Sequence, residues 1–201
     1  AFQKAAAARF FQTALRPVDR AAVYSISSIP ELAHPLTNNF GALVRTVESF
    51  GKAEGATALF DTVAEAAEYL KQTNGRRVLI VVSDGTDTMS DLDFDTTLAR
   101  LLATHCQVYS VRVGHSDNAN LRDLAGERRL QEFAAQTGGA IYAPQTRADY
   151  EEAFQQIVAQ NQMTEDDVSG QLRELTYQRR VQESLGEGVE DVGHRGAADL
   201  G

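Results

Sequence analysis

The sequence is poor in the features that would place it in several common protein classes. Its single cysteine, Cys106, excludes a disulfide within the chain and neither fixes nor excludes secretion. Apolar runs stay far below the ~18 residues of a membrane-spanning helix, and we find no succession of basic, apolar and small residues typical of a signal peptide. Lys and Arg number 19 against 28 Asp and Glu, so no basic surface is expected for nucleic acid.

The length and composition of the chain indicate one globular domain with a tail. The chain has 201 residues, of which 43% are hydrophobic and 23% charged. Composition changes after about Gln162, because six of the fifteen glycines and nine acids lie beyond it. We therefore predict a domain over residues 1–160 and an acidic, glycine-rich, partly disordered tail over residues 161–201.

Apolar strands alternate with helical patterns along the predicted domain. Strands are expected at 21–27, 78–82, 108–114 and 140–143, and helices at 5–15, 39–50, 58–71, 95–104, around 130–137 and after 146. Residues 31–34 lie between two prolines, which indicates a short edge strand or a loop. The alternation predicts an α/β fold with a doubly wound, mostly parallel sheet and right-handed crossovers.

The most informative segment is the apolar run Val78–Val82, which ends abruptly in Ser83-Asp84-Gly85. Open α/β sheets bind ligands at the carboxyl ends of their strands, so the Asp84 carboxylate is a candidate binding group. A plain Asp-Gly turn is the alternative interpretation. Asp87 follows three residues later. It is interpreted as a metal ligand, as a residue that supports the site, or as a solvated acid of the loop.

Signatures of enzymes are missing from the sequence. We find neither a phosphate-binding G-x-x-x-x-G-K-[ST] or G-x-G-x-x-G motif nor a G-x-S-x-G elbow. The four histidines are scattered without an i, i+4 pair, which argues against a zinc site. A non-enzymatic protein is therefore expected, with a Mg²⁺-dependent phosphoryl-transfer or hydrolytic enzyme using Asp84 and Asp87 as the alternative.

Four segments in a fixed order carry a resemblance to a known family. Leu15-Arg16-Pro17-Val18-Asp19, Gly55–Asp61, Ser83-Asp84-Gly85 and Thr137-Gly138-Gly139 together resemble the bacterial branch of the von Willebrand factor type A domain, over residues 1–160. The resemblance implies a Rossmann-like sheet of order 3-2-1-4-5-6. It also implies a metal-ion-dependent adhesion site that holds Mg²⁺ or Mn²⁺ and binds a protein partner.

Within that resemblance, Thr57 and Asp84 map onto two of the metal-binding loops, with Ser83 and Asp87 as weaker candidates. Thr57 could instead be only the N-cap of the helix that follows it. A divalent cation of this kind needs about six oxygen ligands. The expected partner is a protein whose carboxylate takes an open position on the metal.

The sequence departs from the family at one decisive point, because it contains no Asp-x-Ser-x-Ser motif. The family places that motif after its first, central strand, whereas Ala1 already belongs to the following helix, as in a fragment or processed chain. We therefore expect the central strand to be lacking between the Val23 and Val78 strands, and cation binding to be weak or absent. A degenerate scaffold domain without a working site is the further alternative. Relatives are often exported, so an extracytoplasmic or secreted location is expected.

Overall fold

A computed structural model describes residues 2–13, 15–51, 55–113 and 121–161 of the chain. The chain divides into two compact units, Ala1–Val158 and Ala159–Gly201. The acidic, glycine-rich segment predicted as a tail lies almost entirely outside the described residues. Its predicted disorder and the predicted boundary at residue 160 therefore stay predictions.

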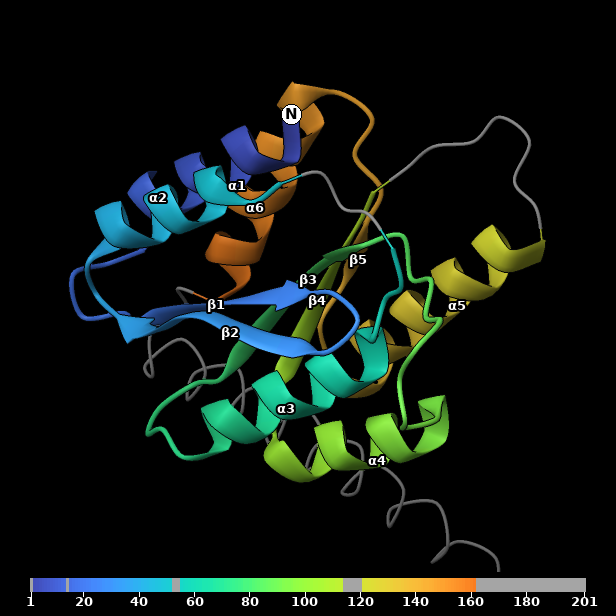
Figure 1. Cartoon of the computed structure of the whole chain (residues 1–201). Coiled ribbons are helices and arrows are strands. Elements are labelled where there is room, and N and C mark those ends of the chain that lie inside the picture. The colour runs from blue at the N-terminus through green and yellow to red at the C-terminus, as the bar shows by residue number, and fades with distance from the viewer. Residues whose placement is uncertain (1, 14, 52–54, 114–120, 162–201) are drawn as a thin grey trace, which may run out of the picture. The chain divides into compact units, whose positions relative to one another are not determined.

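The strands of the first unit form two separate sheets (Figure 1). β1 (Ala21–Ile26) and β2 (Pro30–Thr37) make an antiparallel pair. β3 (Val78–Ser83), β4 (Gln107–Arg112) and β5 (Ile141–Tyr142) make a parallel sheet in the order β3-β4-β5. β2 is longer than the short segment predicted there and contains both prolines, which an edge strand tolerates because one side needs no N–H donor.

Helices cover both faces of the sheets, as the predicted α/β class requires. Every predicted helix is present, and the fifth begins well before the predicted stretch around residues 130–137. The helices are α1 (Phe2–Thr13), α2 (Phe40–Ser49), α3 (Leu59–Lys71), α4 (Phe94–Thr104), α5 (Leu121–Thr137) and α6 (Arg147–Asn161).

Short polar side chains fix several helix ends. Asn39 accepts a hydrogen bond from the Ala42 N–H at the start of α2, and Asp93 accepts one from the Thr96 N–H at the start of α4. A capping box opens α6, where the Asp149 carboxylate accepts a hydrogen bond from the Thr146 N–H at 2.8 Å. This hydrogen bond holds the pKa of Asp149 below its ordinary value.

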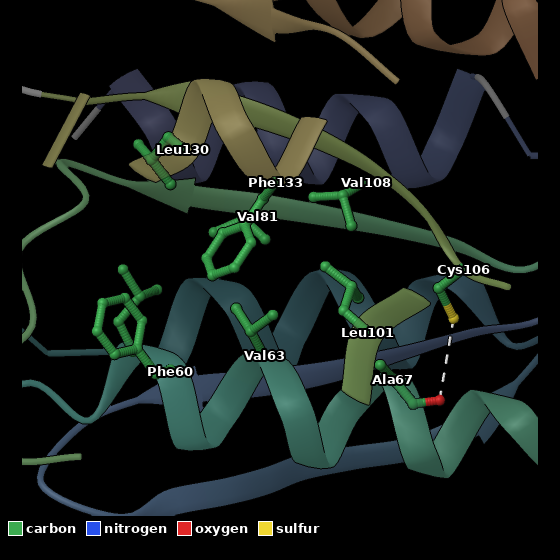
Figure 2. Close-up of a cluster of buried hydrophobic side chains, with 10 residues drawn as sticks. Phe60, Val63, Ala67, Val81, Leu101, Cys106, Val108, Leu130 and Phe133 are labelled. Carbon is green, nitrogen blue, oxygen red and sulfur yellow. Dashed lines mark hydrogen bonds between the residues drawn. The ribbon is translucent and has the colours of Figure 1, made fainter. Parts of the chain in front are cut away.

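The larger core lies on the side of the parallel sheet that faces α3, α4 and α5. Val81 and Val108 of neighbouring strands meet the aromatic rings of Phe60 and Phe133 there (Figure 2). Cys106 also lies in this core, and its thiol donates to the carbonyl of Ala67 at 3.9 Å. Cys106 is buried, and this burial raises the pKa of its thiol, which disfavours the reactive thiolate.

The opposite face of the sheet is covered by α1 and α6. Tyr109 and Val111 of β4 pack there with Phe154 and Ile157 of α6. α1 joins the same cluster through Ala6 and also contributes to a third cluster around β1.

Among the described residues, no strand occupies the position that the sequence predicted to be empty. In the described residues β1 bonds only to β2, and β3 bonds only to β4, so nothing pairs with the facing edges of β1 and β3. The predicted doubly wound sheet without its central strand is therefore confirmed.

Candidate functional site

The carboxyl end of β3 is held in place by a close backbone contact with α5. Gly85 has φ +83°, a conformation that side chains disfavour, and it lies directly against the backbone of Gly126. A Cβ on Gly126 would in turn come within 2.7 Å of the Asp84 carbonyl. The loop that carries Asp84 therefore rests on α5 without an intervening side chain.

Two loops far apart in the sequence meet at this edge. The Thr57 N–H donates to the Thr88 hydroxyl at 2.9 Å, and the Thr57 carbonyl accepts from the N–H groups of Thr88 and Met89 at 2.9 and 3.1 Å. This junction joins the loop before α3 to the loop after β3. It brings Thr57 and Asp84 to the same edge of the fold, as the sequence predicted.

Thr57 and Asp84 keep part of their binding capacity. One oxygen of Asp84 accepts a hydrogen bond from the Thr86 N–H at 2.9 Å, which makes a local turn, while the side chain stays exposed. In the part of the chain that the structure describes, the Thr57 hydroxyl has no hydrogen-bond partner, and Thr57 is not the N-cap of α3. That position belongs to Ala58, whose side chain cannot cap.

Ser83 and Asp87, the weaker candidates, are occupied inside the loop. The Ser83 hydroxyl is buried and accepts from the Gly85 N–H at 3.1 Å. One oxygen of Asp87 accepts from the Phe60 N–H at 3.2 Å and from the Ser90 hydroxyl at 2.6 Å. Asp87 therefore caps α3 from outside the helix, because the N-cap residue Ala58 has no side chain that could accept from the first amides.

Asp61 and Ser90 complete the connection between the loop and α3. Ser90 accepts from the Asp61 N–H at 3.1 Å, and the Asp61 carboxylate accepts from the N–H groups of Asp91 and Leu92 at 2.9 and 3.0 Å. Asp61 therefore acts as a second anchor of the loop after β3. Sequence reasoning missed Ser90 and Gly126, because both depend on contacts with distant segments.

The oxygen ligands at this edge are of the kind that a hard cation prefers, but they are fewer than such a cation needs. A hydroxyl and a carboxylate are suitable oxygen ligands for Mg²⁺ or Mn²⁺, which take about six. Within the described ranges there is no group of three or more His, Cys, Asp or Glu side chains placed to hold a metal ion. The described residues alone therefore do not form a complete metal site.

A cavity of about 430 Å³ lies at the opposite, amino-terminal end of β3 and β4, lined in part by Arg77, His105 and Gln107. The Arg77 guanidinium already donates to the carbonyls of Thr73 and Thr104, at the ends of α3 and α4. Its donors are thus used for helix termination, and the carboxyl edge remains the candidate site.

Comparison with known proteins gives one family. Residues 3–140 match the family model of the von Willebrand factor type A domain. No curated protein matches the chain significantly.

Solved structures of the same fold come from several bacteria. An aerotolerance-related membrane protein from Bacteroides fragilis is 17% identical, with a TM-score of 0.64 over 79% of this chain and 87% of that one. The conserved protein BatB from Bacteroides thetaiotaomicron is 18% identical, with a TM-score of 0.61 over the same shares. A von Willebrand factor type A protein from Catenulispora acidiphila is 17% identical, with a TM-score of 0.60 over 79% of this chain and 37% of that one. At these identities the likeness concerns the fold alone.

Proposed function

Because the chain belongs to the von Willebrand factor type A domain family, we propose that it is a non-enzymatic module that binds a protein partner at the carboxyl edge of its strands. The observation that carries this proposal is the junction between Thr57 and Thr88. It holds an unengaged hydroxyl and an exposed carboxylate at one edge, on loops anchored to α3 and α5. Binding groups on loops fixed by a rigid scaffold are typical of recognition sites.

A divalent cation is part of the proposed interaction. Mg²⁺ or Mn²⁺ would be held by the Thr57 hydroxyl and the free oxygen of Asp84, with the remaining positions filled by water and by oxygens from outside the described residues. A carboxylate of the partner is one such oxygen. The proposal leaves out Ser83 and Asp87, because the Ser83 hydroxyl and one Asp87 oxygen already accept from the backbone amides of Gly85 and Phe60.

The proposal also includes an extracytoplasmic location, as expected from the sequence. One structural neighbour, from Bacteroides fragilis, is called an aerotolerance-related membrane protein. In the portion that the structure describes, no helix of this chain has the length and apolar character to cross a membrane.

A paramagnetic titration tests the proposed site directly. Mn²⁺ added to the isotope-labelled chain should broaden the amide signals of Thr57, Asp84 and Thr88 before those of other residues. The substitution Asp84→Asn should remove this local broadening, since it deletes the charge and retains the oxygen that accepts from Thr86. Binding should be weak, on the order of millimolar, because only two protein ligands are present.

Asp91→Asn is the matched control, because it removes the same charge from an exposed side chain of the same loop. Broadening that falls equally in both variants would mean that Mn²⁺ senses only the acidic loop. No local broadening in the unmodified chain would contradict the metal-assisted proposal and favour a scaffold domain without a working site.

A further inference from the structure

The cavity at the amino-terminal end of β3 and β4 differs in charge from the rest of the chain. Its volume of about 430 Å³ lies within the range of small-molecule sites. Arg76, Arg77 and His105 line it, and none of the described residues around it is acidic. The whole chain, in contrast, has 28 acidic side chains against 19 Lys and Arg. The cavity is therefore a basic region of an acidic chain, which favours an anion as its ligand.

Three helices, α3, α4 and α5, end at this cavity, and their last carbonyls explain some of its donors. Helix C-termini carry partial negative charge and need hydrogen-bond donors. The Arg77 guanidinium donates to the carbonyls of Thr73 and Thr104, after α3 and at the end of α4. The Gln107 amide donates to the Gly138 carbonyl, just after α5. Arg77 and Gln107 therefore form a fixed part of the wall, and the Arg77 charge remains beside the cavity.

His105 has no comparable task at the end of α4. Its backbone N–H donates to the Leu102 carbonyl at 3.2 Å, as any residue at this position could. Within the described ranges its imidazole ring has no hydrogen-bond partner, and the residue is exposed. The ring nitrogens are therefore available to a ligand in the cavity.

The backbone of His105 is strained, which indicates that its side chain is used. His105 has φ +55°, and it is the one residue other than glycine with a positive φ in the described parts of the chain. Glycine is the unstrained choice at such a helix end. Residues held in rarely populated conformations occur preferentially at functional sites. Helix termination alone would favour glycine here, whereas a binding role accounts for histidine.

Leu102 adds an apolar surface to the same cavity. This side chain of α4 is 41% exposed and lies among the lining residues. Small-molecule sites combine apolar surface with a few polar groups that fix the orientation of the ligand. A ligand that matches this cavity therefore has an anionic group and an apolar body. An isolated inorganic anion would fill only part of the volume.

We propose that this cavity is a binding site for a small organic phosphate. The phosphate group lies against the guanidinium charges of Arg76 and Arg77 and accepts a hydrogen bond from the His105 ring, while the apolar body contacts Leu102. Arginine is suited to this task because it stays charged and matches phosphate oxygens. Two guanidinium groups without an acidic neighbour favour a doubly charged phosphate over a singly charged carboxylate. The cavity and the proposed protein-binding edge lie at opposite ends of the strands, so the two proposals are independent.

Phenyl phosphate titrated into the isotope-labelled chain without divalent cations tests the proposal. The amide signals of Arg76, His105 and Gln107 should shift before those of other residues, with an affinity on the order of millimolar for a ligand of this size. Inorganic phosphate should bind the same residues roughly tenfold more weakly, because it lacks the contact with Leu102. Benzoate keeps the ring and carries a single charge, so it should also bind roughly tenfold more weakly.

The substitution His105→Gly separates ligand binding from folding. It removes the ring and the backbone strain together, so the midpoint of urea unfolding should rise while the affinity for phenyl phosphate falls roughly tenfold. Arg76→Gln should also lower the affinity roughly tenfold. Arg100→Gln is the matched control and should leave it unchanged, because it removes the same charge from an exposed side chain of α4 outside the cavity.

Four results would overturn the proposal. The first is a titration with phenyl phosphate in which the signals around the cavity do not move. The second is an equal loss of affinity in Arg76→Gln and Arg100→Gln, which would mean that only the overall charge attracts the anion. The third is an unchanged affinity in His105→Gly, and the fourth is benzoate binding as tightly as phenyl phosphate. None of these results depends on whether Mn²⁺ binds at Asp84.

Discussion

β3 and β4 are neighbouring strands of one parallel sheet, and they differ in how completely their backbones are used. In β4, the N–H groups that face away from β3 have partners, since Val108 donates to the Thr137 hydroxyl and Ser110 to the Ala140 carbonyl, both at 2.9 Å. The corresponding groups of β3 face the interval beside β1. Val108, Tyr109, Ser110 and Val111 are fully buried, whereas only Val81 and Ser83 of β3 are buried.

The comparison shows that neighbours, and not apolar composition, determine burial. β3 reads VLIVVS and is more apolar than β4, which reads QVYSVR, yet β3 is the more exposed strand. A strand becomes a central strand only when both of its edges are paired. Substitutions beside β4, at matched positions of the two strands, and at the carboxyl end of β3 test this difference.

The largest effect is expected where β4 is closed most tightly. A Cβ on Gly139 would fall directly on the carbonyl of Val108, a backbone group that cannot rotate away. Gly139→Ala should therefore lower the free energy of unfolding by roughly 3 kcal/mol or more. Urea denaturation monitored by circular dichroism measures this change.

Gly138→Ala is the control for that substitution. Gly138 has φ +77°, and a Cβ there meets no atom within 4 Å. Only backbone strain is added, so the cost should be about 1–2 kcal/mol. Equal costs at the two glycines would contradict the tight closure of β4 by the segment that leads into β5.

A matched pair of valines tests the comparison between the strands. Val82 of β3 and Val111 of β4 are partners in the parallel register and face the same apolar cluster. Val111→Ala should cost about 2 kcal/mol, because it leaves a cavity in a fully buried position. Val82→Ala should cost less than about 1 kcal/mol, since water already reaches that side chain.

Urea denaturation of both valine variants gives the two costs on the same scale. Equal costs would mean that β3 is as well enclosed as β4, and would remove the basis of the comparison.

Much of the fold could be predicted from local sequence patterns. The apolar run that ends at Ser83 located β3, and the order of motifs indicated the family. The lack of pairing between β1 and β3 was also predictable, because the family's strand order places the missing strand between them. The length of β2 was not, since prolines are compatible with either an edge strand or a loop.

The candidate site was predicted less completely, because contacts with segments far away in the sequence determine the role of each side chain. The sequence indicated Thr57 and Asp84, and the structure brings both to one edge. Whether they bind a cation stays a prediction. Nothing in the spacing of Asp87 indicates that its carboxylate accepts from the Phe60 N–H, 27 residues earlier in the chain. The contact of Gly126 with the Asp84 loop is equally invisible, since it joins two segments through backbone atoms.

A comparably small effect is expected at the anchored carboxyl end of β3. Asp87→Ala removes the acceptor of the Phe60 N–H and of the Ser90 hydroxyl, so it should lower the free energy of unfolding by about 1 kcal/mol. Because Asp87 acts as a helix cap, Mn²⁺ should still broaden the Asp84 signal in this variant. Loss of that broadening with unchanged stability would instead make Asp87 a metal ligand. Asp61, Gly126 and the junction between Thr57 and Thr88 would then hold the carboxyl end of β3, while its edge stays open beside β1.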